Sequence, residues 1–121
     1  MDMRTTTRQV DMVTILDVSG KIVLGEESAA LRARILDLVK QGHKQILLNL
    51  NEVTHIDSLG LGILVSSFAS VKKQDGQLKL LNLTSKVQDL LQVTRLYTVF
   101  EIMDDEAAAI RSFQQTATAT A

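Results

Sequence analysis

The fold is decided by residues 44–62, which read KQILLNLNEVTHIDSLGLG. The apolar run at residues 46–48 has no polar interruption, which is typical of a strand that is covered on both faces in a parallel sheet. Working outward from it, we predict a strand over Lys44–Leu50, a loop over Asn51–Asp57 and a helix over Ser58–Gln74.

Apolar residues at helical spacing mark a helix on either side of this strand. The first is predicted over Glu26–Gln41, and its apolar face is formed by Leu31, Ile35, Leu38 and Val39. The second begins at Ser58, and its apolar stripe is formed by Leu61, Leu64, Val65 and Phe68. The second stripe is explained better as core than as a cofactor site.

The remainder of the chain alternates between strands and helices in the same way. Toward the N-terminus we predict a strand over Val10–Val18, a two-residue turn at Ser19-Gly20 and an antiparallel strand over Lys21–Leu24. Toward the C-terminus we predict a strand over Leu78–Leu83, a helix capped by Ser85, a short strand over Val99–Met103 and a helix over Asp104–Gln115.

The predicted element order is β-β-α-β-α-β-α-β-α. Strands that are separated by helices favour right-handed crossovers and a mostly parallel sheet, and the opening β-hairpin makes that sheet mixed. We therefore predict a single α/β domain over residues 1–115, followed by a flexible C-terminal tail over 116–121. Function in such sheets gathers at the carboxyl ends of the strands, where Asn51–Asp57 is expected.

Composition excludes several classes of function. The 121 residues carry 13 basic and 14 acidic side chains, so there is no basic footprint for nucleic acid or for an anionic membrane. The chain has no Cys, which excludes disulfides, thiolate metal sites and a Cys nucleophile. No stretch approaches the ~20 apolar residues of a membrane span, and residues 1–9 lack the apolar core of a secretory signal. We expect a cytoplasmic protein that needs neither metal nor cofactor.

The segment Thr54–Gly62 holds the chemistry-bearing residues of the chain. Asp57 and Ser58 stand where a helix N-terminus is expected, and either side chain could cap free backbone N–H groups. Gly60 and Gly62 are poor helix formers, so we expect close packing or the approach of a partner's backbone. One interpretation of the segment is therefore structural: a helix cap followed by small residues.

The other interpretation makes Ser58 a phosphoacceptor. A helix N-terminus tolerates a phosphate well, because the free N–H groups and the helix dipole favour an anion. A phosphoserine adds about −1.5 to −2 charges, here beside the carboxylate of Asp57. Such a charge could end the binding of a partner without unfolding the domain.

From about Val10 to Phe113 the chain resembles the STAS family, and most closely the bacterial anti-sigma factor antagonists. The resemblance is strongest in Leu48-Asn49-Leu50-Asn51, Val53 and Ile56-Asp57-Ser58-Leu59-Gly60-Leu61-Gly62, with further support from Leu91, Leu96 and residues 99–102. The family pattern is an apolar strand followed by Asp-Ser-(Ser or Thr)-Gly-Leu-Gly at the start of a helix. Leu59 departs from it, since Ser or Thr is usual there.

The resemblance implies a partner-switching regulator that is not an enzyme. In that family the unphosphorylated antagonist binds an anti-sigma factor, which is also a serine kinase, and so frees a sigma factor. The kinase phosphorylates the Ser that follows the Asp, and a serine phosphatase reverses this. Carried over, Ser58 is the phosphorylation site, and the residues expected to contact the partner are Thr54, His55, Asp57, Leu59, Gly60 and Leu61. We expect a monomer or a weak dimer.

Three other functions compete with this interpretation. A hydrolase would need His55, Asp57 and Ser58 to converge, which residues of one short loop rarely do. A dinucleotide site is weakly supported, since the third glycine position is Val65 and no P-loop Lys follows. The third alternative keeps the STAS fold but makes the chain an interaction subunit of a stress-sensing assembly or a lipid-transport complex.

Overall fold

The computed structural model describes the backbone of residues 3–23 and 25–120, and side chains within these ranges as far as Gln114. The described elements are β1 (Met3–Val10), β2 (Val13–Ile22), α1 (Glu26–Lys40), β3 (Gln45–Ile56), α2 (Ser58–Lys73), β4 (Gln77–Leu81), α3 (Ser85–Thr94), the short 3-10 helix η1 (Leu96–Thr98), β5 (Ile102–Met103) and α4 (Glu106–Thr120).

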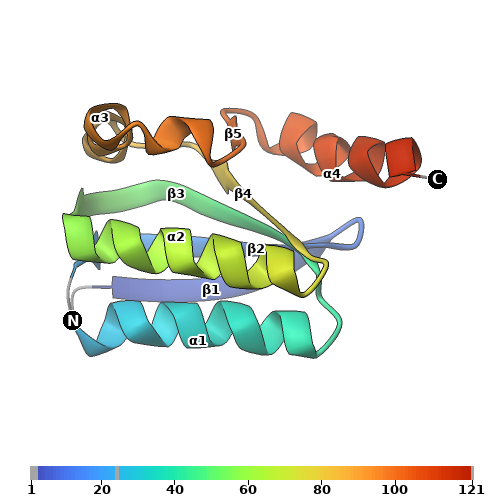
Figure 1. Ribbon diagram of the computed structural model, residues 1–121, viewed down its shortest axis with the longest axis horizontal. Coiled ribbons are helices and arrows are strands. Elements are labelled where there is room, and N and C mark those ends of the chain that lie inside the picture. The colour runs from blue at the N-terminus through green and yellow to red at the C-terminus, as the bar shows by residue number, and fades with distance from the viewer. Residues whose placement is uncertain (1–2, 24, 121) are drawn as a thin grey trace.

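The strands form one sheet in chain order, β1-β2-β3-β4-β5 (Figure 1). β1 is antiparallel to β2, and every later pair of neighbours is parallel. This confirms the predicted α/β fold, with its opening hairpin, its mostly parallel mixed sheet and its order β-β-α-β-α-β-α-β-α.

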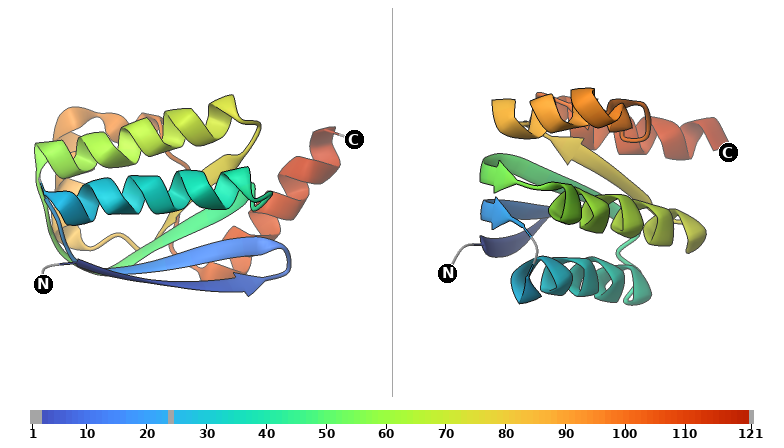
Figure 2. Two further views of the ribbon diagram at one scale, coloured as in Figure 1. Left: turned by 90° about the horizontal axis from the view of Figure 1, so that it is seen from below. Right: turned by 60° about the vertical axis from the view of Figure 1, so that its left-hand side comes forward.

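Helices cover both faces of the sheet, because successive strand residues point to opposite sides. Leu16, Leu48 and Leu80 face a core that α1, α2 and α3 complete. Ile15 and Leu47 face a second core that α4 completes. In Figure 2, α1 and α2 run side by side, and α4 lies beyond the strands from α1. Two covered faces explain the uninterrupted apolar run of β3.

The hairpin turn is not where the sequence indicated. The chain reverses at Asp11 and Met12, with φ of 49° and 69°, between the paired residues Val10 and Val13. The predicted turn at Ser19-Gly20 lies inside β2, so the predicted strands Val10–Val18 and Lys21–Leu24 were wrong. The β2–β3 register shifts at both ends of that dipeptide, and φ of Gly20 is 94°. A Gly there accommodates a bulge within a strand, which resembles a turn in the sequence.

β3 is longer than predicted, and the expected loop over Asn51–Asp57 was wrong. The strand continues to Ile56, with only Asp57 between it and α2. Its last part pairs with β2 as far as Ile22 opposite Ile56, although most of its side chains are exposed. Backbone pairing, rather than burial of side chains, extends this strand.

Smaller boundary errors occur near the C-terminus. The N-cap of α3 is Thr84, without a side-chain cap bond, so Ser85 is the first helical residue rather than the cap. The last strand begins only at Ile102. The helix predicted over Asp104–Gln115 is found over Glu106–Thr120, whereas the single domain predicted over residues 1–115 stays a prediction. The flexibility predicted for 116–121 stays a prediction, because Ala121 and the side chains of 115–120 lie outside the described part.

A charged network, here called the Arg8 network, joins β1, β2 and β3 to α4. Arg8 on β1 donates from Nε to Asp17 Oδ2 at 2.7 Å and from Nη1 to Glu106 Oε2 at 3.0 Å. Asn49 donates to Asp17 Oδ1 at 2.8 Å. The hydrogen bonds from Arg8 hold the pKa of both Asp17 and Glu106 below their usual values, and these bonds to the two carboxylates raise the pKa of Arg8.

Candidate functional site

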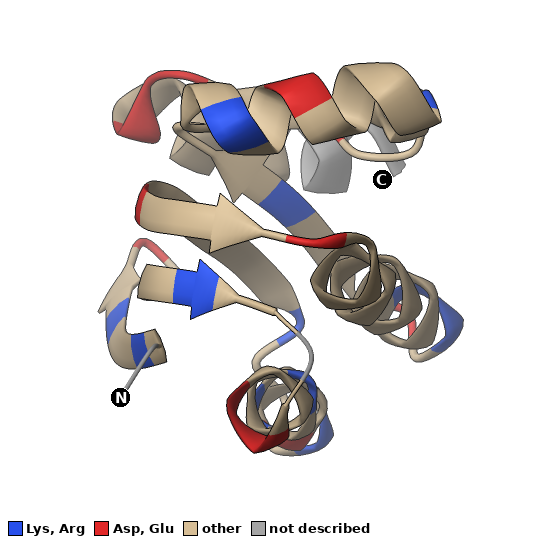
Figure 3. Ribbon diagram, turned by 90° about the vertical axis from the view of Figure 1, so that its left-hand side faces the viewer, with Lys and Arg blue, Asp and Glu red and all other residues tan. Residues whose placement is uncertain are grey.

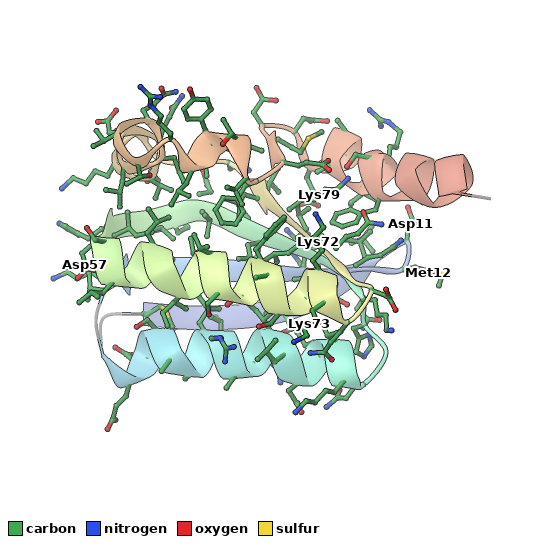
Figure 4. All side chains as sticks on the ribbon, in the orientation of Figure 1. Asp11, Met12, Asp57, Lys72, Lys73 and Lys79 are labelled. Carbon is green, nitrogen blue, oxygen red and sulfur yellow. The ribbon has the colours of Figure 1, made fainter. Side chains whose placement is uncertain are left out.

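The site forms where β3 passes directly into α2. Asp57 has an extended backbone and is the N-cap of α2, and its Oδ1 accepts a hydrogen bond from Gly60 N–H at 2.7 Å. The carbonyl of Asp57 accepts from Leu61 N–H at 2.8 Å, which begins the helix. The capping role that the sequence offered to either Asp57 or Ser58 is therefore performed by Asp57. Figure 4 labels Asp57 at this end of the molecule.

Gly60 lets the first turn of α2 contact the end of β2. A Cβ at this position would lie 1.8 Å from the carbonyl oxygen of Ile22, so no side chain fits without a backbone shift. Asp57 N–H also points to that carbonyl, at 3.4 Å. Leu61 is buried in the core directly behind this contact. These contacts fix the cap, and the residue that follows it, against the sheet.

Gly62 differs from Gly60 in its surroundings. It is exposed, and a Cβ built there would meet no described atom within 4 Å. The sequence offered close packing or a partner's approach as reasons for a glycine. The structure gives the first reason to Gly60, and among the described residues it shows no packing contact that would require a glycine at position 62.

Ser58 is exposed at the first position of α2. Among the described residues, its hydroxyl has no hydrogen-bond partner, because Asp57 occupies the capping position before it. The oxygen is therefore open to a reagent from solvent. Because residues at the start of a helix leave N–H groups without an intrahelical partner, a phosphate added here would find donors and a favourable dipole.

The other predicted contact residues lie around Ser58 and present a mixed surface. Leu59 presents a large apolar side chain that is 57% exposed. Thr54 donates its hydroxyl to the Gly20 carbonyl at 3.2 Å, and His55 Nδ1 lies 3.1 Å from Thr54 Oγ1. Gly60 and Leu61 are buried, so they shape the site from behind and do not present side chains to a partner. Figure 3 looks onto this end of the molecule.

Sequence reasoning missed the part of the site that α3 contributes. A shallow hollow of about 330 Å³ lies beside the end of β3, and Val93 on its rim is 82% exposed. Ile56, which lines it, precedes Ser58 by two residues, so the hollow lies near the start of α2. The hollow lay outside the prediction because Leu90, which was expected to face inward, is only half buried. The residues that line it are Ile56, Lys86, Asp89, Leu90 and Val93.

The geometry does not assemble a nucleophilic triad. The hydrogen bond found for the His55 ring runs to Thr54, and Asp57 Oδ1 is bound to a backbone N–H, so neither is seen to activate Ser58. Within the described ranges, no group of three or more His, Cys, Asp or Glu side chains is placed to hold a metal ion. Over the same ranges, every helix is too short or too polar to cross a bilayer. What the arrangement offers is an exposed hydroxyl beside a fixed carboxylate, on a surface that mixes exposed polar residues with the apolar side chain of Leu59.

Comparison with known proteins finds a family of regulators that share this chain's sequence pattern. The STAS domain family matches residues 4–109. The anti-sigma-B factor antagonist of Bacillus subtilis is 31% identical over 102 residues, which are 84% of this chain and 92% of that protein. Its counterpart in Listeria monocytogenes is 30% identical over 99 residues, 82% of this chain and 85% of that protein. Both are named as regulators and not as enzymes, in agreement with the prediction that this chain is not an enzyme.

Solved structures show the same fold. An anti-sigma factor antagonist from Mycobacterium paratuberculosis superposes with a TM-score of 0.77 at 21% identity, covering 91% of this chain and 92% of that one. The Bacillus protein SpoIIAA in its phosphorylated form gives a TM-score of 0.71 at 20% identity, covering 91% and 99%. Both likenesses concern the fold. The family match over residues 4–109, which is most of the chain, shows that this chain belongs to the STAS domain family.

Proposed function

We propose that this chain is an anti-sigma factor antagonist that acts by partner switching at Ser58. In its unphosphorylated form it binds an anti-sigma factor that is also a serine kinase, and so frees a sigma factor in the cytoplasm. Phosphorylation of Ser58 ends the binding, and a serine phosphatase restores it. One observation carries the proposal: the hydroxyl of Ser58 is exposed and has no described partner, next to a carboxylate that already caps the helix.

The proposed mechanism follows from charge and desolvation. Leu59, Val93 and the half-buried Ile56 and Leu90 offer an apolar surface that a partner can cover when Ser58 is neutral. A phosphate adds about −1.5 to −2 charges beside the carboxylate of Asp57, and a partner that covers Ser58 would have to desolvate that charge. The fold remains intact, because the Asp57 cap and the Gly60 contact do not involve the Ser58 hydroxyl.

The first experiment asks whether Ser58 is the modified residue. We expect mass spectrometry, after incubation with the cognate kinase and ATP, to find one phosphate on Ser58 and none on Ser58→Ala. Ser85→Ala is the matched control, since Ser85 is also exposed and also begins a helix, but follows Thr84 instead of an aspartate. Full labelling of Ser58→Ala would contradict the proposal.

The second experiment asks whether charge at this position ends binding. We expect Ser58→Asp to weaken binding to the kinase by at least tenfold in calorimetry, the equivalent of about 1.4 kcal/mol. Gln41→Asp, at an exposed position that follows the C-terminal end of α1, should leave the affinity within about a factor of two, because local charge only matters inside the interface. An unchanged affinity of Ser58→Asp would favour a STAS interaction subunit without a phosphoserine switch.

A further inference from the structure

A second hollow, here called the β4-edge cleft, lies far from Ser58. It has a volume of about 450 Å³, within the range of small-molecule sites. α2 contributes Phe68 and Lys72, β4 contributes its first residues, and the segment 98–101 closes the other side. Lys72 follows Ser58 by fourteen residues on the same helix, which is about 21 Å at 1.5 Å per residue. The two sites can therefore be tested separately.

The floor of the cleft is an open edge of the sheet. β5 pairs only with Leu80 and Leu81, so β4 has no strand partner on that side before Leu80. Leu80 N–H and Asn82 N–H both donate toward the β5 side, to Glu101 O and Met103 O. Because direction alternates along a strand, the N–H and C=O of Leu78 point the same way, into the cleft. The cleft thus offers a backbone donor and acceptor with no strand to bind them.

The walls of the cleft are aromatic and carry one available cation. The rings of Phe68 and Phe100 form an edge-to-face pair with centroids 5.3 Å apart. Lys72 Nζ lies 5.9 Å from the Phe68 centroid, and no carboxylate of the described residues lies within 4 Å of it. Figure 4 places Lys72 on the β4 side of α2 and Lys73 on the α1 side.

The other charges at the cleft already have partners. Lys79 is buried, and its Nζ contacts Glu101 Oε2 at 3.1 Å and donates to Ser112 Oγ at 2.9 Å. Its ammonium also lies 4.6 Å from the Phe113 ring centroid. Lys79 and Glu101 therefore balance each other, and the uncompensated charge at the cleft is the single positive charge of Lys72. This favours a ligand with one negative charge over a polyanion such as a nucleotide triphosphate.

We propose that the β4-edge cleft binds a small organic monocarboxylate with an aromatic or aliphatic body. The body packs against Phe68 and Phe100, the carboxylate pairs with Lys72 Nζ, and the N–H of Leu78 supplies a hydrogen bond. Nothing in this assignment depends on phosphorylation of Ser58 or on the identity of a protein partner.

The test uses 4-phenylbutanoate as the probe and its neutral amide, 4-phenylbutanamide, as the matched ligand. Titrated into the full chain and followed by two-dimensional amide NMR, the acid should bind saturably with a dissociation constant of about 1 mM, reasonable for a ligand of this size. The largest shifts should be those of the Leu78 and Phe100 amides, and the amides of residues 57–60 should not move. The absence of saturable shifts, or shifts spread over the surface, would overturn the proposal.

Two lysine variants separate the carboxylate contact from general attraction. Lys72→Gln should weaken the acid about fivefold and leave the amide unchanged, because it removes a charge-assisted hydrogen bond. Lys73→Gln is the control, since Lys73 is exposed on the same turn but does not line the cleft. Equal losses in the two variants, or equal affinity of acid and amide for the unmodified chain, would refute the monocarboxylate assignment.

A third variant tests the location. Val99 lines the cleft and is 38% exposed, so Val99→Trp can fill the cleft without disturbing the buried core. We expect this variant to keep a dispersed spectrum and to lose the saturable shifts of both ligands. Retained binding in a folded Val99→Trp variant would place the ligand elsewhere and contradict the proposal.

Discussion

Asp17 and Asp57 both lie at the sheet, but the molecule surrounds their carboxylates differently. Asp17 accepts from Arg8 and Asn49, in a network that also includes Glu106 on the far helix. Asp57 accepts from the backbone N–H of Gly60, at the exposed start of α2. The carboxylate of Asp17 is paired with a cationic side chain from another strand. The described hydrogen bond of Asp57 instead comes from the backbone of α2, the helix that Asp57 caps.

This difference separates a structural charge from a site that can change charge. The Arg8 network holds β1, β2 and α4 together, so altering its charge alters the stability of the fold. At Asp57 the cap is satisfied locally, and the neighbouring hydroxyl of Ser58 takes no part in it. A new charge at Ser58 should therefore change what binds the molecule more than how stable it is. The following predictions test this contrast through the free energy of unfolding.

The largest effect is expected where α2 contacts β2. Gly60→Ala places a Cβ against the Ile22 carbonyl, and the forced backbone shift should lower the free energy of unfolding by about 3 kcal/mol. Gly62→Ala is the matched control, because its Cβ meets nothing and the helix gains about 1 kcal/mol from alanine. Urea unfolding of both variants measures the two changes. Equal effects would show that the contact with Ile22 does not fix the cap.

The Arg8 network should give the next largest effect. Arg8→Met leaves Asp17 and Glu106 side by side without their cation, and we expect a loss of about 1–2 kcal/mol, since solvent screens part of the interaction. Arg4→Met controls for the loss of a cation from β1, because Arg4 is exposed and has no described ion pair. Thermal or urea unfolding at low salt measures both. A loss in Arg4→Met as large as in Arg8→Met would mean that general charge, not the network, matters.

The same network predicts how stability depends on pH. The hydrogen bonds from Arg8 lower the pKa of Asp17 and Glu106 in the folded chain, so the unfolded chain binds protons at a higher pH than the folded chain. Their contribution is therefore complete above the ordinary values of 3.8 and 4.5, and is lost as the pH falls below them. Urea unfolding between pH 7 and pH 3 should show this decline. The decline should be shallower in Arg8→Met, and an identical slope would exclude the network as its source.

The smallest effect is expected at the switch itself. Asp57→Ala removes the N-cap of α2 and should cost about 1 kcal/mol of unfolding free energy. Ser58→Ala is the neighbouring control, and it should stay within about 0.5 kcal/mol, as an exposed residue without a described partner does. Chemical denaturation resolves the two. If Ser58→Ala were as damaging as Asp57→Ala, the hydroxyl would have a structural role and would no longer be a free acceptor.

The predicted fold was correct where burial imposes a period on the sequence. The stripes of α1 and α2 and the apolar run of β3 all reflect contact with a core, and their positions agree with the structure. β1 carries no such signal, because it is an edge strand rich in Thr and Arg with most side chains at least partly exposed. Backbone pairing with β2, and not the hydrophobicity of its own side chains, makes β1 a strand. The turn beside it uses Asp11 and Met12, and Met is not a residue that marks a turn.

The candidate site could be predicted in part for the same reason. Asp57, Ser58 and Gly60 are adjacent in the chain, so their place at a helix start could be inferred from local rules. The Ile22 carbonyl that excludes a side chain at Gly60, and the exposed Val93 beside the end of β3, come from distant elements. Those contacts depend on the bulge in β2 and on the placement of α3, which no local pattern encodes.

The order of the strands also bears on how the chain matures during synthesis. Each strand lies beside the one made just before it, so every strand that leaves the ribosome finds its neighbour already outside. Sequential pairing keeps the closing loops short, which limits the entropy lost at each step. The bond between Arg8 and Glu106 joins residues 98 positions apart and can form only when the last helix has emerged. Its closure joins the first described strand to the last described helix.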